Sequence, residues 1–225
     1  MKTLKQLQTI IHYHFKDVQI LEKALIHRSF SKNHNNERLE FLGDSVLGLV
    51  ISAHLFNRQK KAPEGELSRI RSSLVKEDAL ATVSRDINLG DYLKLGSGEL
   101  KSGGYRRASI LSDAMEALFG AVYIDGGYAE CEKIILFLYQ EYLVTLPSPT
   151  DLKDPKTALQ EYLQSNKIDL PEYEVVQTVG KSHDQTFTVE CRIDRLKISA
   201  LGKGSSRKKA EQMAASIGLK EARRN

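Results

Sequence analysis

Two stretches of the sequence combine an apolar helical pattern with paired carboxylates: residues 36–50 (NERLEFLGDSVLGLV) and 110–123 (ILSDAMEALFGAVY). In each stretch the two carboxylates stand three or four positions apart, so they share one face of a helix. The surrounding residues are apolar nearly all round, which predicts that both helices are largely buried. The pairs are Glu40 with Asp44, and Asp113 with Glu116.

Four carboxylates on apolar helices need compensation, because a buried charge is tolerated only beside a counter-charge or a metal ion. The nearby cation in the sequence is Arg38, and one guanidinium cannot balance four carboxylates. Oxygen ligands without histidine or cysteine favour a hard divalent cation, Mg²⁺ or Mn²⁺, over zinc. The sequence therefore predicts a divalent metal site between the two helices. The alternative is that both pairs are solvent-facing charges on amphipathic helices.

Helical patterning fills the first two thirds of the chain and stops at residues 146–156 (LPSPTDLKDPK), where three prolines interrupt it. Beyond this break the pattern is helix, three strand-like runs and helix, which predicts a small α+β domain. We therefore expect an all-α domain at residues 1–146, a linker at 147–153 and an α-β-β-β-α domain at 154–225. The helices expected in the first domain are 37–57, 65–74, 77–87, 109–124 and 129–142. In the second, helices 155–165 and 206–223 flank strands at 173–179, 185–193 and 196–201.

The net charge of +4 lies in the last third of the chain. Residues 153–225 hold 14 Lys and Arg against 10 Asp and Glu, whereas the remainder holds 19 of each sign. Four of the basic residues form a cluster, which indicates a polyanion partner. The alternative is an ordinary solvated helix face. The cluster consists of Lys203, Arg207, Lys208 and Lys209.

Several classes of protein are disfavoured by what the sequence lacks. No run of about 18 uncharged apolar residues predicts a membrane span, and no GxxxxGK[ST] loop predicts a nucleotide cofactor. The two cysteines, Cys131 and Cys191, have no CxxC spacing. We therefore expect that the protein neither inserts into a membrane nor binds a nucleotide cofactor. We also expect it to lie in the reducing cytoplasm.

Residues 36–45 (NERLEFLGDS) and 109–127 (SILSDAMEALFGAVYIDGG) resemble the catalytic helices of the ribonuclease III family. The last third resembles a double-stranded-RNA-binding domain, most clearly at residues 202–210 (GKGSSRKKA). The domain order is that of the simple bacterial class. The resemblance implies a homodimeric, Mg²⁺-dependent endoribonuclease, with Mn²⁺ as a substitute, that hydrolyses phosphodiesters in both strands of duplex RNA. It also implies staggered ends with 5′-phosphates and 3′-hydroxyls, and the processing of ribosomal RNA precursors and some messenger RNAs.

The resemblance also assigns the acidic residues. The family's four metal-binding carboxylates match Glu40, Asp44, Asp113 and Glu116, of which Asp44 and Glu116 match the two usually assigned as catalytic. Glu37 and Glu64 match accessory acidic positions near the RNA path or the dimer cleft. The alternative for Glu64 is a charge favoured by the dipole at a helix N-terminus.

In the second domain, the resemblance implies recognition of duplex shape rather than of base sequence. Glu211 departs from the general pattern, because many such domains carry a lysine there, and this predicts weak RNA binding by the domain alone. The alternative for His183 is an ordinary turn residue. The implied minor-groove contacts are Gln160, Glu161 and His183, and the implied phosphate contacts are Lys203, Arg207 and Lys208.

A two-fold dimer would supply one acidic cluster for each strand of a duplex. Gly43 and Gly48 permit close packing either at that interface or inside the monomer. Two other functions compete with the nuclease: a non-catalytic RNA-binding scaffold and a phosphohydrolase of small molecules. The scaffold does not explain the retained carboxylates, and the phosphohydrolase does not explain the basic domain.

Overall fold

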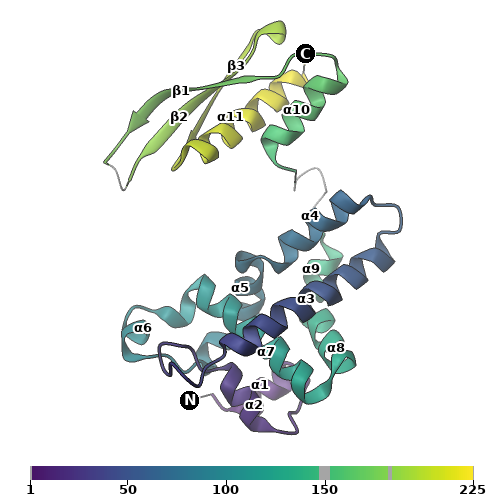
Figure 1. Ribbon diagram of the computed structural model, residues 1–225, viewed down its shortest axis with the longest axis vertical. Coiled ribbons are helices and arrows are strands. Elements are labelled where there is room, and N and C mark those ends of the chain that lie inside the picture. Colours follow the sequence, from purple (N-terminus) through teal and green to yellow (C-terminus); the bar gives the residue numbers. More distant parts are fainter. Residues whose placement is uncertain (1, 147–152, 182–183, 225) are drawn as a thin grey trace. The chain divides into compact units, whose positions relative to one another are not determined.

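The structure, a computed structural model, describes residues 2–146, 153–181 and 184–224 (Figure 1). The chain divides into two compact units, Met1–Pro147 and Ser148–Asn225. The linker predicted at 147–153 lies outside the described residues, apart from Lys153.

The regular elements of the first unit are helices, and within its described residues the β-structure is one isolated bridge between Ile26 and Lys94. Four of its five longest helices agree with the sequence prediction to within two residues at each end. The helix predicted at 129–142 is divided at Tyr139, whose buried hydroxyl donates a hydrogen bond to the Leu74 carbonyl at 3.2 Å. The helices are α1 (Leu4–Ile10), α2 (Val18–Ala24), α3 (Glu37–Arg58), α4 (Glu64–Val75), α5 (Glu77–Asp86), α6 (Ser97–Lys101), α7 (Ala108–Gly126), α8 (Tyr128–Leu138) and α9 (Gln140–Val144).

The centre of the first unit is the packing of α3 against α7, which lie side by side in Figure 1. Two glycines let the two backbones touch. A Cβ atom on Gly43 would lie 1.7 Å from the Glu116 carbonyl oxygen, and one on Gly120 would lie 2.1 Å from the Leu39 carbonyl oxygen. Gly43 therefore serves packing inside the monomer. Within the part of the chain that the structure describes, no atom lies within 4 Å of such a Cβ on Gly48, so this position is open to a partner.

One helix among the described residues, α3, is long and apolar enough to cross a membrane by length and composition alone. Such a composition is also that of a core helix, and α3 packs against α4, α7 and α8. Its remaining face exposes three large apolar side chains: Phe41 (79% exposed), Leu49 (56%) and Phe56 (72%). The apolar surface of α3 is therefore larger than the part of it that is buried within the monomer.

The second unit has the predicted α-β-β-β-α order. Its antiparallel sheet has the strand order β1-β2-β3. The C-terminal helix packs against β2 and β3, and the first helix of the unit packs against the C-terminal helix (Figure 1). Asp154 caps the first helix by accepting a hydrogen bond from the Thr157 amide. The elements are α10 (Pro155–Ser165), β1 (Glu172–Val179), β2 (Thr186–Ile193), β3 (Ile198–Gly204) and α11 (Arg207–Ala222).

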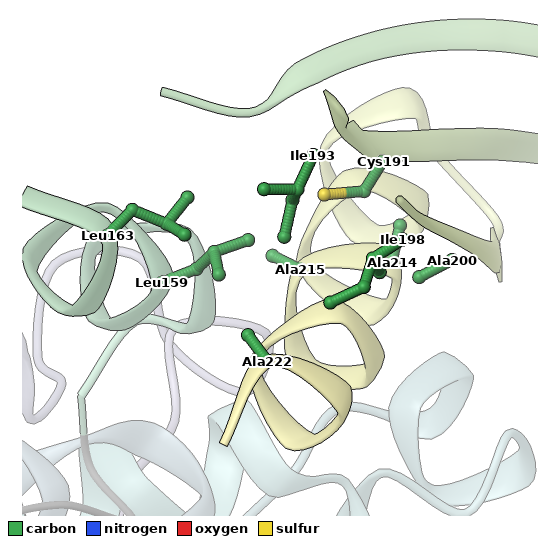
Figure 2. Close-up of a cluster of buried hydrophobic side chains, with 9 residues drawn as sticks. All are labelled: Leu159, Leu163, Cys191, Ile193, Ile198, Ala200, Ala214, Ala215 and Ala222. Carbon is green, nitrogen blue, oxygen red and sulfur yellow. The ribbon is translucent and has the colours of Figure 1, made fainter. Parts of the chain in front are cut away.

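The third strand begins two residues later than predicted. Ile193 pairs with Ile198, so the residues between them form the connection rather than the strand. Within that connection Lys197 adopts a left-handed conformation with φ of 53°. The core beneath the sheet joins small side chains of α11 to leucines of α10 and to residues of β2 and β3 (Figure 2).

Candidate metal centre and nucleic-acid interface

The close contact between α3 and α7 brings their carboxylates together. Glu40 projects from α3 one turn before Gly43, and Asp113 and Glu116 project from the first half of α7. One carboxylate oxygen from each of these three residues lies within 4.8 Å of the other two. All three side chains are half-buried. Three hard oxygen ligands therefore converge on a volume suited to one divalent cation.

Asp44 lies one turn beyond Glu40 on α3 and is exposed. It does not belong to the group of three whose oxygens lie within 4.8 Å. Its charge nevertheless contributes to raising the pKa of Glu116 and of Glu40. The structure thus brings together three of the four predicted ligands and places the fourth at the solvent side of the cluster.

Negative charge prevails in the cluster, although Arg28 acts to lower the pKa of Glu40 and His27 acts to lower that of Asp113. Burial, together with the neighbouring carboxylates, raises the pKa of Glu116 to about 8 and that of Glu40 to about 7. Burial also raises the pKa of Asp113, against the opposing effect of a hydrogen bond that Ser112 donates to it. Among the described residues, no salt bridge reaches any of the four carboxylates. A divalent cation would relieve this repulsion.

The two accessory acidic positions have different surroundings. Glu37 lies beside the cluster, where it pairs with Arg28 at 3.1 Å and contributes to raising the pKa of Glu40. Glu64 is the first residue of α4, and it accepts a hydrogen bond from Ser68 at 2.6 Å. It lines a groove with Phe56, which lies sixteen residues, or about 24 Å of helix, from Glu40. Within one chain, Glu64 is therefore remote from the cluster.

A cleft of about 690 Å³ adjoins the cluster at Asp113. Three basic side chains line it, namely Arg28, Lys32 and Arg107. Arg107 is paired with Glu99 at 3.0 Å. These three residues are not predicted from the sequence, because loops that are distant in sequence bring them together. The signal that could have found them is basic residues just before each carboxylate-bearing helix. Glu37 and Glu99 also line the cleft, where they pair with Arg28 and Arg107, so among the described residues Lys32 is the basic lining residue that forms no salt bridge.

The second unit carries the predicted basic cluster on its surface. Lys203 lies in β3 and is exposed. Arg207 and Lys208 form the start of α11 and are also exposed, and Ser206 caps the helix by accepting a hydrogen bond from the Lys209 amide. These cations therefore lie on two elements, the strand β3 and the helix α11, which pack directly against each other.

The remaining predicted RNA contacts lie elsewhere in the second unit. Gln160 and Glu161 are exposed neighbours on α10, and Glu161 is ion-paired with Lys153. His183 lies outside the described residues. Glu211 faces the basic residues, because it accepts hydrogen bonds from both Lys156 and Arg207.

Comparison with known proteins agrees with this two-unit description. A family model described as ribonuclease-III-like matches residues 17–142, and a model of the double-stranded RNA binding motif matches residues 155–221. Ribonuclease 3 of Shewanella amazonensis is 54% identical over 215 residues, which cover 96% of this chain and 95% of that protein. Ribonuclease 3 of Shewanella frigidimarina is 53% identical over the same shares of the two chains.

Solved structures match the first unit. A crystal structure of the nuclease domain of ribonuclease III from Campylobacter jejuni is 41% identical, with a TM-score of 0.62, and covers 65% of this chain and 100% of that one. A second structure of that domain is 42% identical, with a TM-score of 0.61, and covers 62% of this chain and 97% of that one.

The helical unit with its acidic cluster and the attached α-β-β-β-α unit define a metal-dependent nuclease joined to a duplex-RNA-binding domain. The chain belongs to the ribonuclease III family, in its bacterial two-domain form. The resemblance, the fold class and the enzyme class predicted from the sequence are confirmed.

Proposed function

We propose that the protein uses bound Mg²⁺ to hydrolyse phosphodiesters in both strands of duplex RNA, leaving 5′-phosphates and 3′-hydroxyls on staggered ends. The observation that carries this proposal is the convergence of Glu40, Asp113 and Glu116, none of which forms a salt bridge within the described residues. Relatives named ribonuclease 3 span nearly the whole chain, which supports the reaction class. Processing of ribosomal RNA precursors and some messenger RNAs, in the cytoplasm, is part of the same proposal.

The residues present fit a hard divalent cation. Glu40, Asp113 and Glu116 would hold it through carboxylate oxygens, which favour Mg²⁺, or Mn²⁺ in its place, over zinc. When bound, the cation supplies Lewis-acid chemistry that lowers the pKa of the attacking water and neutralises charge on the scissile phosphate. Binding requires ionised carboxylates, so the cation must compete with protons for Glu40 and Glu116.

Asp44 and Glu116 are the residues to which we assign the chemistry. Glu116 lies in the half-buried group, where its carboxylate would help to hold the divalent cation. Asp44 is exposed beside that group, so its carboxylate oxygens are accessible to a water molecule. In this assignment Asp44 orients the attacking water, and its loss leaves the ligand group itself in place.

The second unit would recognise the shape of the RNA duplex rather than its base sequence. Lys203, Arg207 and Lys208 would contact phosphates across the major groove, while Gln160 and Glu161 on α10 would reach a minor groove. The exposure of all five side chains and the match to a double-stranded RNA binding motif support this part. A minor-groove contact by His183 remains a prediction.

We also propose that the protein is a homodimer through its first unit. The exposed apolar face of α3, which includes Leu49 and Phe56, borders a groove of about 440 Å³ between α3 and α4. Large exposed apolar patches mark association surfaces. One related structure from Campylobacter jejuni is described as showing flexibility in a region involved in dimer formation of the nuclease domain. A second copy is the occupant that this face fits, since it also provides the second cluster that a duplex requires.

The test is to incubate the purified protein with long duplex RNA, with and without Mg²⁺, and to analyse the ends of the products. We expect short duplexes with 5′-phosphates, formed only with a divalent cation. Cleavage of single-stranded RNA at the same rate would refute the proposed specificity. RNA binding without any cleavage, across a series of divalent cations, would favour the non-catalytic scaffold.

A further inference from the structure

One carboxylate lies inside the basic surface of the second unit. Glu211, in the second turn of α11, accepts a hydrogen bond from the Lys156 ammonium at 2.8 Å and one from the Arg207 Nε at 2.9 Å. Its side chain is only 14% exposed, so both ion pairs are formed on a nearly buried acid. These two cations lower the pKa of Glu211, which therefore stays ionised at neutral pH.

The two partners of Glu211 differ in their surroundings. The Arg207 side chain is 66% exposed and belongs to the cluster that we assign to RNA phosphates. The Lys156 side chain is 36% exposed, and its Nζ atom lies 4.3 Å from the centre of the Tyr173 ring. Lys203 and Lys208, by contrast, form no salt bridge within the described part of the chain. Of the three cations assigned to RNA phosphates, Arg207 is therefore the one that forms an ion pair with Glu211.

We infer that Glu211 attenuates RNA binding, because it competes with backbone phosphates for the Arg207 guanidinium and repels them with its own charge. The inference rests on the proposed binding of duplex RNA by this unit. A purely structural role is the competing explanation, since the pair with Lys156 also joins α10 to α11. The two roles predict opposite signs: loss of an attenuator strengthens RNA binding, whereas loss of a structural contact weakens it.

The size of the effect follows from counterion release. Each phosphate contact contributes about 0.9 to the slope of log affinity against log salt. If removal of the Glu211 charge frees Arg207 for one full contact, the slope steepens by about that amount. The ratio of variant to unmodified affinity then grows about threefold as salt falls from about 200 to about 50 mM.

The experiment measures the affinity of the full chain for duplex RNA against KCl concentration, without divalent cations so that the RNA stays intact. The variant is Glu211→Gln, which keeps a similar shape and removes the charge. The matched control is Glu172→Gln, which removes the same charge from a pair with Arg192, at 3.3 Å, on the sheet. We expect tighter binding and a steeper slope for Glu211→Gln, and an unchanged slope for Glu172→Gln.

A second pair of variants keeps the inference testable if Glu211→Gln lowers the melting temperature. Arg207→Gln should weaken binding more in the Glu211→Gln background than in the unmodified chain, because only there is the guanidinium free. Equal losses in both backgrounds, or weaker binding by Glu211→Gln, would overturn the inference and leave a structural role. Absence of duplex binding by the unmodified chain would instead refute the proposed function.

Discussion

The contact between α3 and α7 can be tested by the substitution Gly43→Ala. The added Cβ would lie 1.7 Å from the Glu116 carbonyl oxygen, whereas real Cβ atoms essentially never approach within 3.0 Å. The two backbones must therefore separate by at least 1.3 Å, the difference between these distances. Overpacking of a core costs about 1–3 kcal/mol. Because the obstacle is backbone, which cannot rotate away, we expect a loss at the upper end, about 3 kcal/mol of unfolding free energy.

The same displacement moves Glu40 away from Glu116. A misplacement of about 1 Å costs on the order of 100-fold in the rate of a catalysed reaction. We therefore expect Gly43→Ala to lower the cleavage rate by about that factor even where the protein remains folded. Urea unfolding measures the stability, and cleavage of duplex RNA at saturating Mg²⁺ measures the rate.

Gly98→Ala is the matched control for this prediction. Gly98 lies in α6, and a Cβ there meets no atom within 4 Å. An alanine in a helix is favoured over glycine by about 0.5–1 kcal/mol, so this variant should be as stable as the unmodified protein or slightly more so. Full stability and full activity of Gly43→Ala would show that the helices do not touch as described, and the reasoning would fail.

Four further outcomes are expected. Glu116→Gln or Asp44→Asn should abolish cleavage and leave the gel shift of duplex RNA nearly intact; equal loss of both would mean that the acids hold the fold. Metal-free protein should lose stability as pH rises from about 5 to about 8, because its folded state holds the protons of Glu40 and Glu116 more tightly than the unfolded state. Urea unfolding checks this, and Glu116→Gln should flatten the trend. Deletion of residues 153–225 should raise the RNA concentration needed for cleavage and flatten its salt dependence. Leu49→Glu should convert the dimer to monomers, as measured by light scattering. A persistent dimer would show that the apolar face of α3 is not the dimer interface.

The sequence predicted those parts of the fold and site that depend on local pattern. Long helices such as α3 and α7 follow from apolar periodicity, and the spacing of Asp113 and Glu116 places both on one face. The sequence did not predict α1 or α2, which have seven residues each. Helix α1 begins at a capping box formed by Thr3 and Gln6, and α2 begins at the capping residue Asp17. Helices this short depend on tertiary packing rather than on pattern.

Features set by the packing of distant segments could not be predicted. Both glycines and carboxylates are visible in the sequence, but the crossing of α3 and α7 decides that Asp44 lies outside the closest group of ligands. The cleft beside Asp113 is assembled from loops whose nearest cations in the sequence, Lys32 and Arg107, are 75 positions apart. In the second unit, the left-handed residue Lys197 delays the third strand, and no residue preference signals it.

The main-chain contact at Gly43 and Gly120 also determines how the enzyme should respond to mutational damage elsewhere. The spacing of the ligand-bearing helices is set by peptide groups in contact, so it does not depend on the rotamers of surrounding side chains. Substitutions that shrink distant core residues should reduce the population of folded molecules while each surviving molecule keeps its full turnover rate. Activity in a series of such variants should then track the folded fraction alone.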